Sequence, residues 1–429
     1  MAKIKPMKAV LYNKEEIPDL SSVICPPYDV ISSARQEFFH QLDPHNFIHL
    51  ILGKEAPGED KYRSAGLLFN EWLKKKILVQ DDKPSIYFYN QQYKVKGENK
   101  TRLGFIALLH LGDKKSPVFG HENTHVAPRE DRLKLLRQVK ANLSPIFVLF
   151  ADKKRVIKKI QQEDVQNKKP FMEARDDEGV IHKLWKIEDP AALNDIVACM
   201  NDENIFIADG HHRFEVACSY REEIKQKLNR ELTGEEDINY ILAYFTNMDS
   251  RGLTIMPIHR LVNVGSGFDL DAFLENMKQY FSVEEMKDKG RLFFLMEKAG
   301  MNEHVIGLYK NKKYFLLRLK NVKILDKIIA DKTPEYRSLD VAILNYMILK
   351  ELVELDFDNK AVFTFSPDAE ECIEKVDGDP SRIAFFLNPT KVQQITAIAL
   401  KGEKMPQKST YFYPKVASGL VVNKHNDSK

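Results

Sequence analysis

The run Asp209-Gly210-His211-His212-Arg213 combines residue types and spacing that could bind and act on a phosphate group. The apolar residues 205–208 before it are typical of a buried strand, and the Asp-Gly pair ends that strand in a turn. The apolar residues after it recur every fourth position, the spacing of one helical face: Val216, Tyr220, Ile224 and Leu228. The pattern therefore predicts a strand, a tight turn and a helix that begins on the motif.

A helix that begins at this turn would favour an anion, because its first N–H groups lack partners and its dipole is positive at that end. Gly210 would let the backbone approach a phosphate closely, and Arg213 could hold two phosphate oxygens as a fork. His211 and His212 would add donors. We predict a phosphate site at these four residues, and the alternative is a capped helix with an Asp-Gly turn and surface histidines.

A second group of possible anion ligands lies near the end of the chain, in the aromatic and lysine-rich block 402–415. Lys408, Ser409, Thr410 and Lys415 offer ammonium and hydroxyl donors, and we predict that they contact the same phosphates. The alternative is a tail strand that only packs on the core.

The segment His121-Glu122-Asn123-Thr124-His125 matches H-E-x-x-H, the signature of zinc proteases. That chemistry needs a helix, so that both histidines share a face and bind the metal. Gly120 and Pro128 bracket the segment, and Asn and Thr are weak helix formers, so we expect a loop. A zinc hydrolase is thus a minor alternative, beside a plain surface turn and a catalytic role for Glu122.

The Asp209–Arg213 run resembles the phosphate-binding motif of the ParB/sulfiredoxin-like superfamily, and in particular that of its free serine kinases. Sulfiredoxins carry a cysteine where this chain has His211, so repair of sulfinic acids is not expected. ParB proteins keep mainly the glycine and arginine of the motif, which correspond to Gly210 and Arg213.

The rest of the chain resembles a larger bacterial family that includes pyrophosphate-dependent serine kinases. The resemblance extends over nearly the whole chain and is carried by these segments: Pro27-Tyr28-Asp29-Val30, His121-Glu122, Asp131-Arg132-Leu133, Asn142-Leu143-Ser144-Pro145, Pro257-Ile258-His259-Arg260 and Met405-Pro406-Gln407-Lys408-Ser409-Thr410-Tyr411-Phe412.

The resemblance implies a phosphotransferase that converts free L-serine to O-phosphoserine, with pyrophosphate as donor. It implies that Glu122 acts as base on the serine hydroxyl, together with Asp209 and His211 as catalytic residues. Mg²⁺ would bridge the donor phosphates, with Asp209 as its protein ligand. The expected acceptor-binding residues, partly on a rigid Pro-Pro loop and partly near a strand end, are Tyr28, Asp29, His121, Asn247, His259 and Arg260.

Two further alternatives concern the donor and the reaction. ATP or ADP could replace pyrophosphate, although the chain has neither a Walker loop nor a protein-kinase H-R-D signature. A ParB-like nucleotide switch without phosphotransfer would require a helix-turn-helix and a basic surface, and neither is evident.

The composition is that of a globular protein of 429 residues, with 43% hydrophobic and 30% charged residues. A net charge of +3 gives no case for nucleic acid, and no stretch is apolar enough to span a membrane. The four scattered cysteines predict reduced thiols in the cytoplasm. We expect small-molecule substrates as the only partners, with the oligomeric state left open.

Strand and helix patterns alternate along the chain, which predicts a mixed α/β fold. We expect a ParB/sulfiredoxin-like catalytic region over 1–262 and a C-terminal α/β domain over 263–429, whose terminal segment returns to the site. The expected elements include a hairpin over 85–111, a hairpin over 171–187, and helices over 131–139, 270–281 and 339–352.

Overall fold

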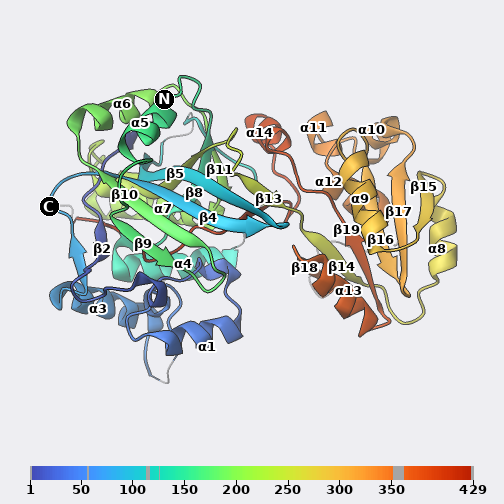
Figure 1. The fold of residues 1–429 in the computed structure, drawn as a ribbon, viewed down its shortest axis with the longest axis horizontal. Coiled ribbons are helices and arrows are strands. Elements are labelled where there is room, and N and C mark those ends of the chain that lie inside the picture. The colour runs from blue at the N-terminus through green and yellow to red at the C-terminus, as the bar shows by residue number, and fades with distance from the viewer. Residues whose placement is uncertain (1, 56–57, 113–115, 125, 351–361, 427–429) are drawn as a thin grey trace. The chain divides into compact units, whose positions relative to one another are not determined.

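The computed structural model describes residues 2–55, 58–112, 116–124, 126–350 and 362–426. The chain forms two compact units. Unit 1 comprises Met1–Gly120, Thr124–Thr254 and Pro414–Lys429, and unit 2 comprises His121–Asn123 and Ile255–Tyr413. Each unit combines a sheet with helices (Figure 1), so the mixed α/β fold is confirmed.

The division between the units differs from the predicted boundary after residue 262. That position falls inside strand β14 (His259–Asn263), which pairs on both sides with strands of unit 2 and therefore belongs to that unit. The last residues from Pro414 onward belong to unit 1, because β21 (Asn423–Lys424) pairs with β7 (Ala141–Asn142) there.

The core of unit 1 is a nine-stranded sheet in the order β6-β11-β8-β12-β5-β4-β10-β9, with β1 also paired to β5. Strand β11 runs parallel to β6 and antiparallel to β8. The strands are β1 (Ile4–Lys5), β4 (Ile86–Val95), β5 (Glu98–His110), β6 (Val118–Gly120), β8 (Ile146–Phe150), β9 (Met172–Arg175), β10 (Ile181–Ile187), β11 (Ile205–Asp209) and β12 (Tyr240–Asn247). Both predicted hairpins, β4–β5 and β9–β10, are confirmed.

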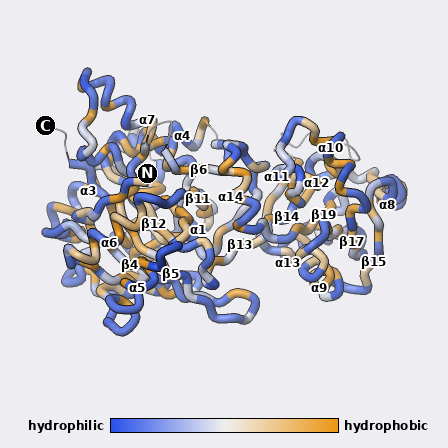
Figure 2. Tube along the Cα trace, turned by 90° about the horizontal axis from the view of Figure 1, so that it is seen from above, coloured by the Kyte–Doolittle hydropathy of each residue, from blue (hydrophilic) through white to orange (hydrophobic). Residues whose placement is uncertain are grey.

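Apolar residues on these strands form the main core of unit 1, which Figure 2 shows as hydrophobic stretches along β4, β11 and β12. Phe105 of β5 stacks on Phe245 of β12, with ring centroids 4.8 Å apart. Burial of these large apolar side chains is the main force that holds the strand register, because a slip by one residue would turn them to the other face.

The helices of unit 1 include a packed series of α3, α4 and α7. Their bounds are α1 (Ser33–Leu42), α2 (Ile48–Ile51), α3 (Lys61–Lys74), α4 (Val126–Val139), α5 (Val156–Asp164), α6 (Pro190–Met200) and α7 (His211–Leu228), with short turns η1 (Leu20–Ser22), η2 (Tyr28–Val30) and η3 (Asp237–Asn239). A small ladder pairs β2 (Val10–Tyr12) with β3 (Leu78–Gln80). The predicted helix 131–139 is therefore the second part of α4.

Unit 2 contains a six-stranded sheet in the order β15-β17-β16-β19-β14-β18. Its strands are β14, β15 (Phe281–Met286), β16 (Val305–Lys310), β17 (Lys313–Leu319), β18 (Phe363–Ser366) and β19 (Arg382–Phe386), and a separate ladder joins β13 (Thr254–Met256) to β20 (Tyr411–Tyr413). Its helices are α8 (Leu270–Met277), α9 (Lys289–Ala299), η4 (Val322–Ile324), α10 (Leu325–Ile328), α11 (Pro334–Arg337), α12 (Asp340–Ile343), η5 (Leu344–Lys350), α13 (Ala369–Asp377) and α14 (Val392–Leu400).

Two predicted helices of unit 2 differ from the structure. The helix expected over 270–281 ends at Met277, and Phe281 begins strand β15. The helix expected over 339–352 is α12 followed by the π-helical segment η5, which ends at Lys350; residues 351 and 352 lie outside the described residues.

Cys25, Cys199, Cys218 and Cys372 are free thiols in the structure, as the scattered cysteines predict. Within the described ranges, no helix combines the length and the apolar character that crossing a membrane requires.

Candidate functional site

The strand–turn–helix predicted at the motif is confirmed: β11 ends at Asp209, and α7 begins at His211. Gly210 stands between them as the N-cap, with φ 92° and ψ 28°, and no described side chain caps the helix there. Only glycine adopts this left-handed conformation without strain. A Cβ at this position would also lie 2.9 Å from Ile146 Cγ2 and 3.1 Å from Arg213 Cζ. The turn therefore requires glycine for two separate reasons.

Two cations meet on the carboxylate of Asp209 at this turn. Arg213 Nη2 donates to Asp209 Oδ2 at 2.8 Å, and Lys415 Nζ donates to Oδ1 at 2.6 Å. Burial opposes ionisation of Asp209, but the charges of Lys415 and Arg213 outweigh it and lower the pKa of the carboxyl to about 2. The carboxylate thus stays ionised and holds an ammonium and a guanidinium together beside the first turn of α7.

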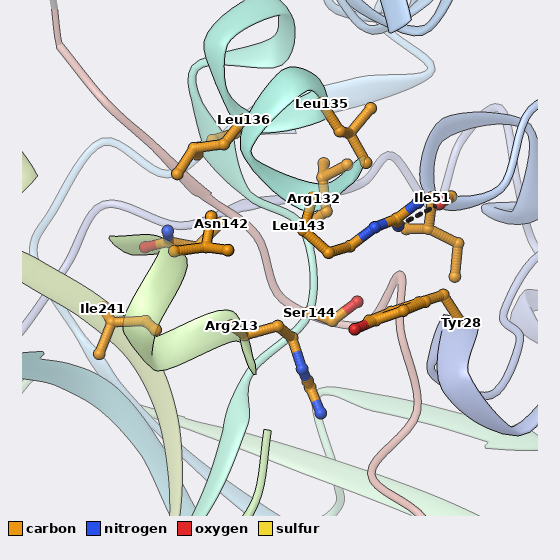
Figure 3. Close-up of a pocket in the computed structure, with 12 residues that line it drawn as sticks. Tyr28, Ile51, Arg132, Leu135, Leu136, Asn142, Leu143, Ser144, Arg213 and Ile241 are labelled. Carbon is orange, nitrogen blue, oxygen red and sulfur yellow. Dashed lines mark hydrogen bonds between the residues drawn. The ribbon is translucent and has the colours of Figure 1, made fainter. Parts of the chain in front are cut away.

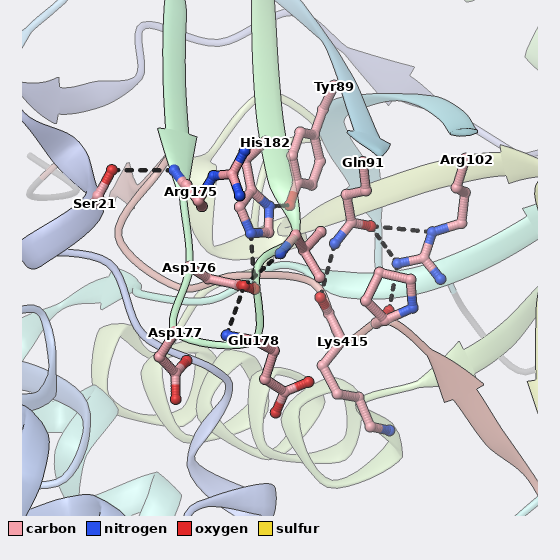
Figure 4. A network of polar contacts seen from close by, with 12 residues as sticks. Ser21, Tyr89, Gln91, Arg102, Arg175, Asp176, Asp177, Glu178, His182 and Lys415 are labelled. Atoms are coloured by element: carbon pink, nitrogen blue, oxygen red, sulfur yellow. Dashed lines mark hydrogen bonds and ion pairs between the residues drawn. The ribbon is translucent and has the colours of Figure 1, made fainter. Parts of the chain in front are cut away.

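The backbone that carries Lys415 is fixed by buried side chains of the central sheet (Figure 4). Arg102 of β5 donates to the carbonyl oxygen of Pro414 at 2.5 Å, and Gln91 of β4 donates to that of Lys415 at 2.8 Å. Arg102 also donates to Gln91 Oε1 at 3.0 Å, and both side chains are fully buried. These contacts tie the C-terminal segment to the sheet and explain how a residue so far along the chain reaches the motif.

An apolar pocket with a cavity volume of about 70 Å³ lies beside Arg213 in unit 1. Its polar lining residues include Tyr28, Arg132, Ser144 and Arg213, and Figure 3 shows the hydroxyl groups of Tyr28 and Ser144 near each other, with the Arg213 guanidinium directed away from them. The opposite walls are apolar side chains, among them Leu135, Leu136, Leu143, Val216 and Ile241. We call the turn at Asp209–Arg213, together with its two cations Arg213 and Lys415, the cationic turn. The pocket therefore offers a hydrophobic surface next to the cationic turn.

Tyr28, predicted to bind the acceptor, is one of the residues of this pocket. The guanidinium of Arg132 lies over its ring at 4.2 Å from the centroid. Burial, and secondarily Asp29, raise the pKa of Tyr28 to about 12, so its hydroxyl stays protonated and can donate. Asp29, the other predicted residue of this loop, is solvent-exposed.

His121, Glu122 and Thr410 lie together, but they belong to unit 2. The hydroxyl of Thr410 donates to Glu122 Oε1 at 3.4 Å and is 3.2 Å from His121 Nε2. The N–H of Met405 donates to the carbonyl oxygen of His121 at 2.8 Å. Unit 2 therefore joins the segment His121-Glu122 to the C-terminal block that contains Thr410. In unit 1, by contrast, the Asp209–Arg213 motif is joined to Lys415.

Arg260, Lys408 and Ser409 are also neighbours in unit 2. Arg260 Nη2 donates to the carbonyl oxygen of Lys408 at 3.0 Å, and the side chains of Lys408 and Ser409 line a small pocket of that unit. The role predicted for Lys408 and Ser409 at the donor phosphates stays a prediction.

Two predicted acceptor-binding residues occupy positions that a structural role explains. His259 is 3% exposed, accepts the N–H of Leu387 at Nδ1 and packs on Phe293 and Phe386. Burial, and secondarily Arg260, lower the pKa of His259 to about 4, as expected for a neutral core histidine. Packing in the core explains this position, and the acceptor-binding role of His259 stays a prediction.

Asn247 is the second of these residues, and its acceptor-binding role also stays a prediction. It lies opposite Phe150 at one end of β8, whereas Asp209 lies opposite Phe147 at the other end, about 10 Å along the strand. Its side chain accepts the N–H of Asp249 and closes a turn. Sequence places Asn247 at a strand end, but the antiparallel pairing of β11 with β8 sets that end away from the motif.

The H-E-x-x-H segment is not helical over His121–Thr124, as predicted, and His125 lies outside the described residues. Among the residues that the structure describes, no three His, Cys, Asp or Glu side chains are grouped as a metal site. Asp209, the predicted Mg²⁺ ligand, is a single carboxylate with both oxygens bound to cations. This donor set does not fit a resident Mg²⁺, which prefers carboxylate oxygens free to coordinate.

Sequence reasoning missed Arg132 and Ser144 as residues of the pocket beside Arg213. Both lie in segments that carry the family resemblance, Asp131–Leu133 and Asn142–Pro145. Membership of these segments could have identified them as candidate pocket residues. The supporting pair Gln91 and Arg102 gave no signal, because a buried polar pair on adjacent strands is visible only once the strands are paired.

Residues 4–342 match the family described as "Protein of unknown function (DUF1015)". A search of curated proteins found no match. The matched residues make up most of the chain, and the protein therefore belongs to this family.

Similar solved structures include a variant of a free serine kinase in complex with ADP, with a TM-score of 0.37 and 12% identity over 75% of this chain and 92% of that chain. Another is a free serine kinase in complex with AMP, with a TM-score of 0.36 and 14% identity over 75% and 91% of the two chains. SbnI with a C-terminal truncation from Staphylococcus aureus has a TM-score of 0.35 and 10% identity over 72% and 84%. Similarities of this strength establish no shared activity.

Proposed function

We propose that this member of the DUF1015 family is a phosphotransferase that transfers a phosphoryl group from pyrophosphate to the hydroxyl of free L-serine. The bond that forms joins the serine oxygen to phosphorus, and the bond that breaks is the P–O bond of the phosphoanhydride. The products are O-phosphoserine and phosphate. The proposal includes a ParB/sulfiredoxin-like core in unit 1, as the motif resemblance implies.

The observation that carries the proposal is the cationic turn at the start of α7. An uncapped helix start, a glycine with positive φ, and two cations held on one buried carboxylate support the binding of a phosphate there. Phosphoryl transfer depends mainly on positioning and on neutralising the charge of the transferred group, and this turn supplies groups for both.

Each residue of the turn has a distinct part in the proposal. Arg213 binds two donor oxygens, and Lys415 neutralises the charge that develops on the leaving phosphate. Asp209 orients both cations, and His211 and His212 add donors at the helix start. Because the donor set at Asp209 does not fit a protein-held Mg²⁺, the proposal includes the ion only as a part of the pyrophosphate substrate.

Glu122 is assigned as the base that takes the proton of the serine hydroxyl. Its contact with Thr410 supports a fixed orientation of the carboxylate within unit 2. His121, Tyr28 and Asp29 stay in the proposed acceptor set. His259 and Asn247 are left out of it because a structural role explains their positions. Arg260 is left out because its guanidinium is bound to backbone carbonyl oxygens of unit 2.

A nucleoside diphosphate or triphosphate is the second candidate donor, and the apolar pocket beside Arg213 favours it. A nucleobase needs a hydrophobic wall, and pyrophosphate does not. The sequence alone gave no indication of such a pocket, because its lining residues come from elements far apart in the chain: η2, α2, α4, β7, α7 and β12.

Steady-state kinetics of Arg213→Ala test the phosphate site. A lost charge-assisted contact of about 1.5–3 kcal/mol predicts a roughly ten- to hundredfold rise in KM for the donor. Lys225→Ala is the matched control, because Lys225 is a partly exposed cation on the same helix, paired to Glu231. Equal donor KM values for the two variants would contradict the proposal.

A further inference from the structure

A second pocket, in unit 2, has a composition that the proposed reaction does not use. Its cavity volume is about 200 Å³. Three cations line it, Arg260, Lys332 and Lys404, together with the aromatic rings of Tyr336, Tyr346, Phe363 and Phe365. None of the described residues that line it is acidic. A pocket of this kind suits a ligand that is both anionic and flat.

The buried positive charge of Arg260 indicates that the ligand of this pocket is an anion. Its side chain is 2% exposed, and its guanidinium donates to the backbone carbonyl oxygens of Ile258, Gln407 and Lys408. Five N–H donors are available in a guanidinium, so these contacts leave capacity for a further acceptor. Burial lowers the pKa of Arg260 to about 9. Among the described residues no carboxylate pairs with Arg260, and a buried charge without a counter-ion is costly, so a bound anion would remove that cost.

The aromatic side chains of the pocket indicate that the ligand also has a flat ring system. Phe365 lies over the Arg260 guanidinium at 4.7 Å from the ring centroid, yet its side chain is 39% exposed. Lys332 Nζ lies 5.4 Å from the centroid of Tyr336. A ring exposed beside cations can stack a nucleobase, while the cations hold its phosphate.

Free serine is a poor fit to this pocket. Its ammonium group would need an acidic partner, and the acids near the pocket, Asp331 and Glu403, lie 3.7 and 4.0 Å from Lys332. Inorganic phosphate alone would leave the aromatic walls without a contact. The pocket therefore matches a nucleoside phosphate better than either.

We propose that the pocket of unit 2 is a binding site for a nucleoside monophosphate, with the phosphate on Arg260, Lys332 and Lys404 and the base against Phe365. This site is separate from the cationic turn of unit 1, and it is independent of the serine phosphotransferase proposal. It assigns binding alone to unit 2 and no chemical step.

Calorimetric titration of the full chain with AMP tests the site. The Arg213→Ala variant is used as background, so that nucleotide bound at the turn of unit 1 does not contribute. We expect one saturable AMP site, with adenosine and inorganic phosphate each binding at least tenfold more weakly. Absence of AMP binding in this background, or inorganic phosphate binding as tightly as AMP, would overturn the proposal.

Substitutions in the same background locate the site. Phe365→Ala and Lys404→Met alter partly exposed side chains, so both variants should fold, whereas Arg260→Gln disturbs a buried side chain. Each is expected to weaken AMP binding at least tenfold. Phe294→Ala and Lys298→Met are matched controls, because this exposed aromatic–lysine pair of unit 2 lies outside the pocket. Equal AMP affinity in the pocket and control variants would place the nucleotide elsewhere and refute the assignment.

Discussion

Lys415 Nζ lies 2.6 Å from Asp209 Oδ1, although 206 residues separate the two in sequence. The C-terminal segment therefore completes the cationic turn of unit 1. Arg213 occupies the other oxygen of the same carboxylate, so one buried anion positions two cations. Substitution of Lys415 should therefore change donor binding, and substitution of Asp209 should also change stability.

Lys415→Met should raise the KM for the phosphate donor about ten- to hundredfold, because one charge-assisted contact is lost. The KM for serine should change much less. Lys424→Met, in the same C-terminal segment, is the control. A larger effect on serine than on the donor would show that Lys415 belongs to the acceptor side.

Asp209→Asn should remove a contribution to the free energy of unfolding that the wild type has at neutral pH and loses in acid. The pKa of Asp209 is about 2 in the fold and 3.8 for the unperturbed group, so the folded state is stabilised above pH 3.8 and loses this term as pH falls towards 2. The difference corresponds to about 2 kcal/mol. Urea unfolding at several pH values measures it, and the wild type and the variant should converge at the lowest pH.

The same variant tests the role of Asp209 toward Mg²⁺. If its carboxylate only orients Lys415 and Arg213, raising the Mg²⁺ concentration should not restore the activity of Asp209→Asn. Restoration of activity by Mg²⁺ would instead identify Asp209 as a metal ligand.

Gly210→Ala should lower both donor binding and stability. The left-handed backbone costs an alanine on the order of 1 kcal/mol, and its Cβ would press on Ile146 and on the Arg213 guanidinium. Gly234→Ala is the control, because nothing lies within 4 Å of a Cβ built there. Thermal unfolding and donor KM together check this, and an unchanged KM in a folded variant would count against the turn.

His425→Phe should reduce the loss of stability on mild acidification. His425 is buried beside Tyr220, and burial lowers its pKa to about 4, with Asp237 opposing the shift. The unfolded chain takes up the proton near pH 6.5 and the folded chain only near pH 4, so the free energy of unfolding falls as pH drops through this interval.

At pH 5 this one group should cost about 2 kcal/mol relative to pH 7, measured by urea unfolding at both values. The control is His45→Phe, at a partly exposed histidine. The same pH dependence in His425→Phe as in the wild type would contradict the assignment.

The sequence predicted the local parts of the site well. The strand, the Asp-Gly turn and the helix with Arg213 are contiguous, so periodicity and turn chemistry were sufficient to locate them. The two hairpins were predicted for the same reason.

The non-local parts could not be predicted in the same way. Lys415 was singled out as a phosphate ligand, but its pairing with Asp209 depends on Gln91 and Arg102 of the central sheet. The surroundings of Asn247 and His259 could not be predicted either, because the side of a sheet and the end of a strand that a residue occupies follow from strand register, which the sequence pattern does not contain.

The most direct test of the central claim is the formation of O-phosphoserine from L-serine by the purified protein, with pyrophosphate, ATP, ADP and CTP supplied in turn and Glu122→Gln as the comparison. We expect O-phosphoserine and phosphate with pyrophosphate, and a much lower turnover at similar serine KM in Glu122→Gln. Product from ATP or ADP alone would favour the nucleotide donor. If no donor gives O-phosphoserine, the proposed serine phosphotransferase activity is wrong.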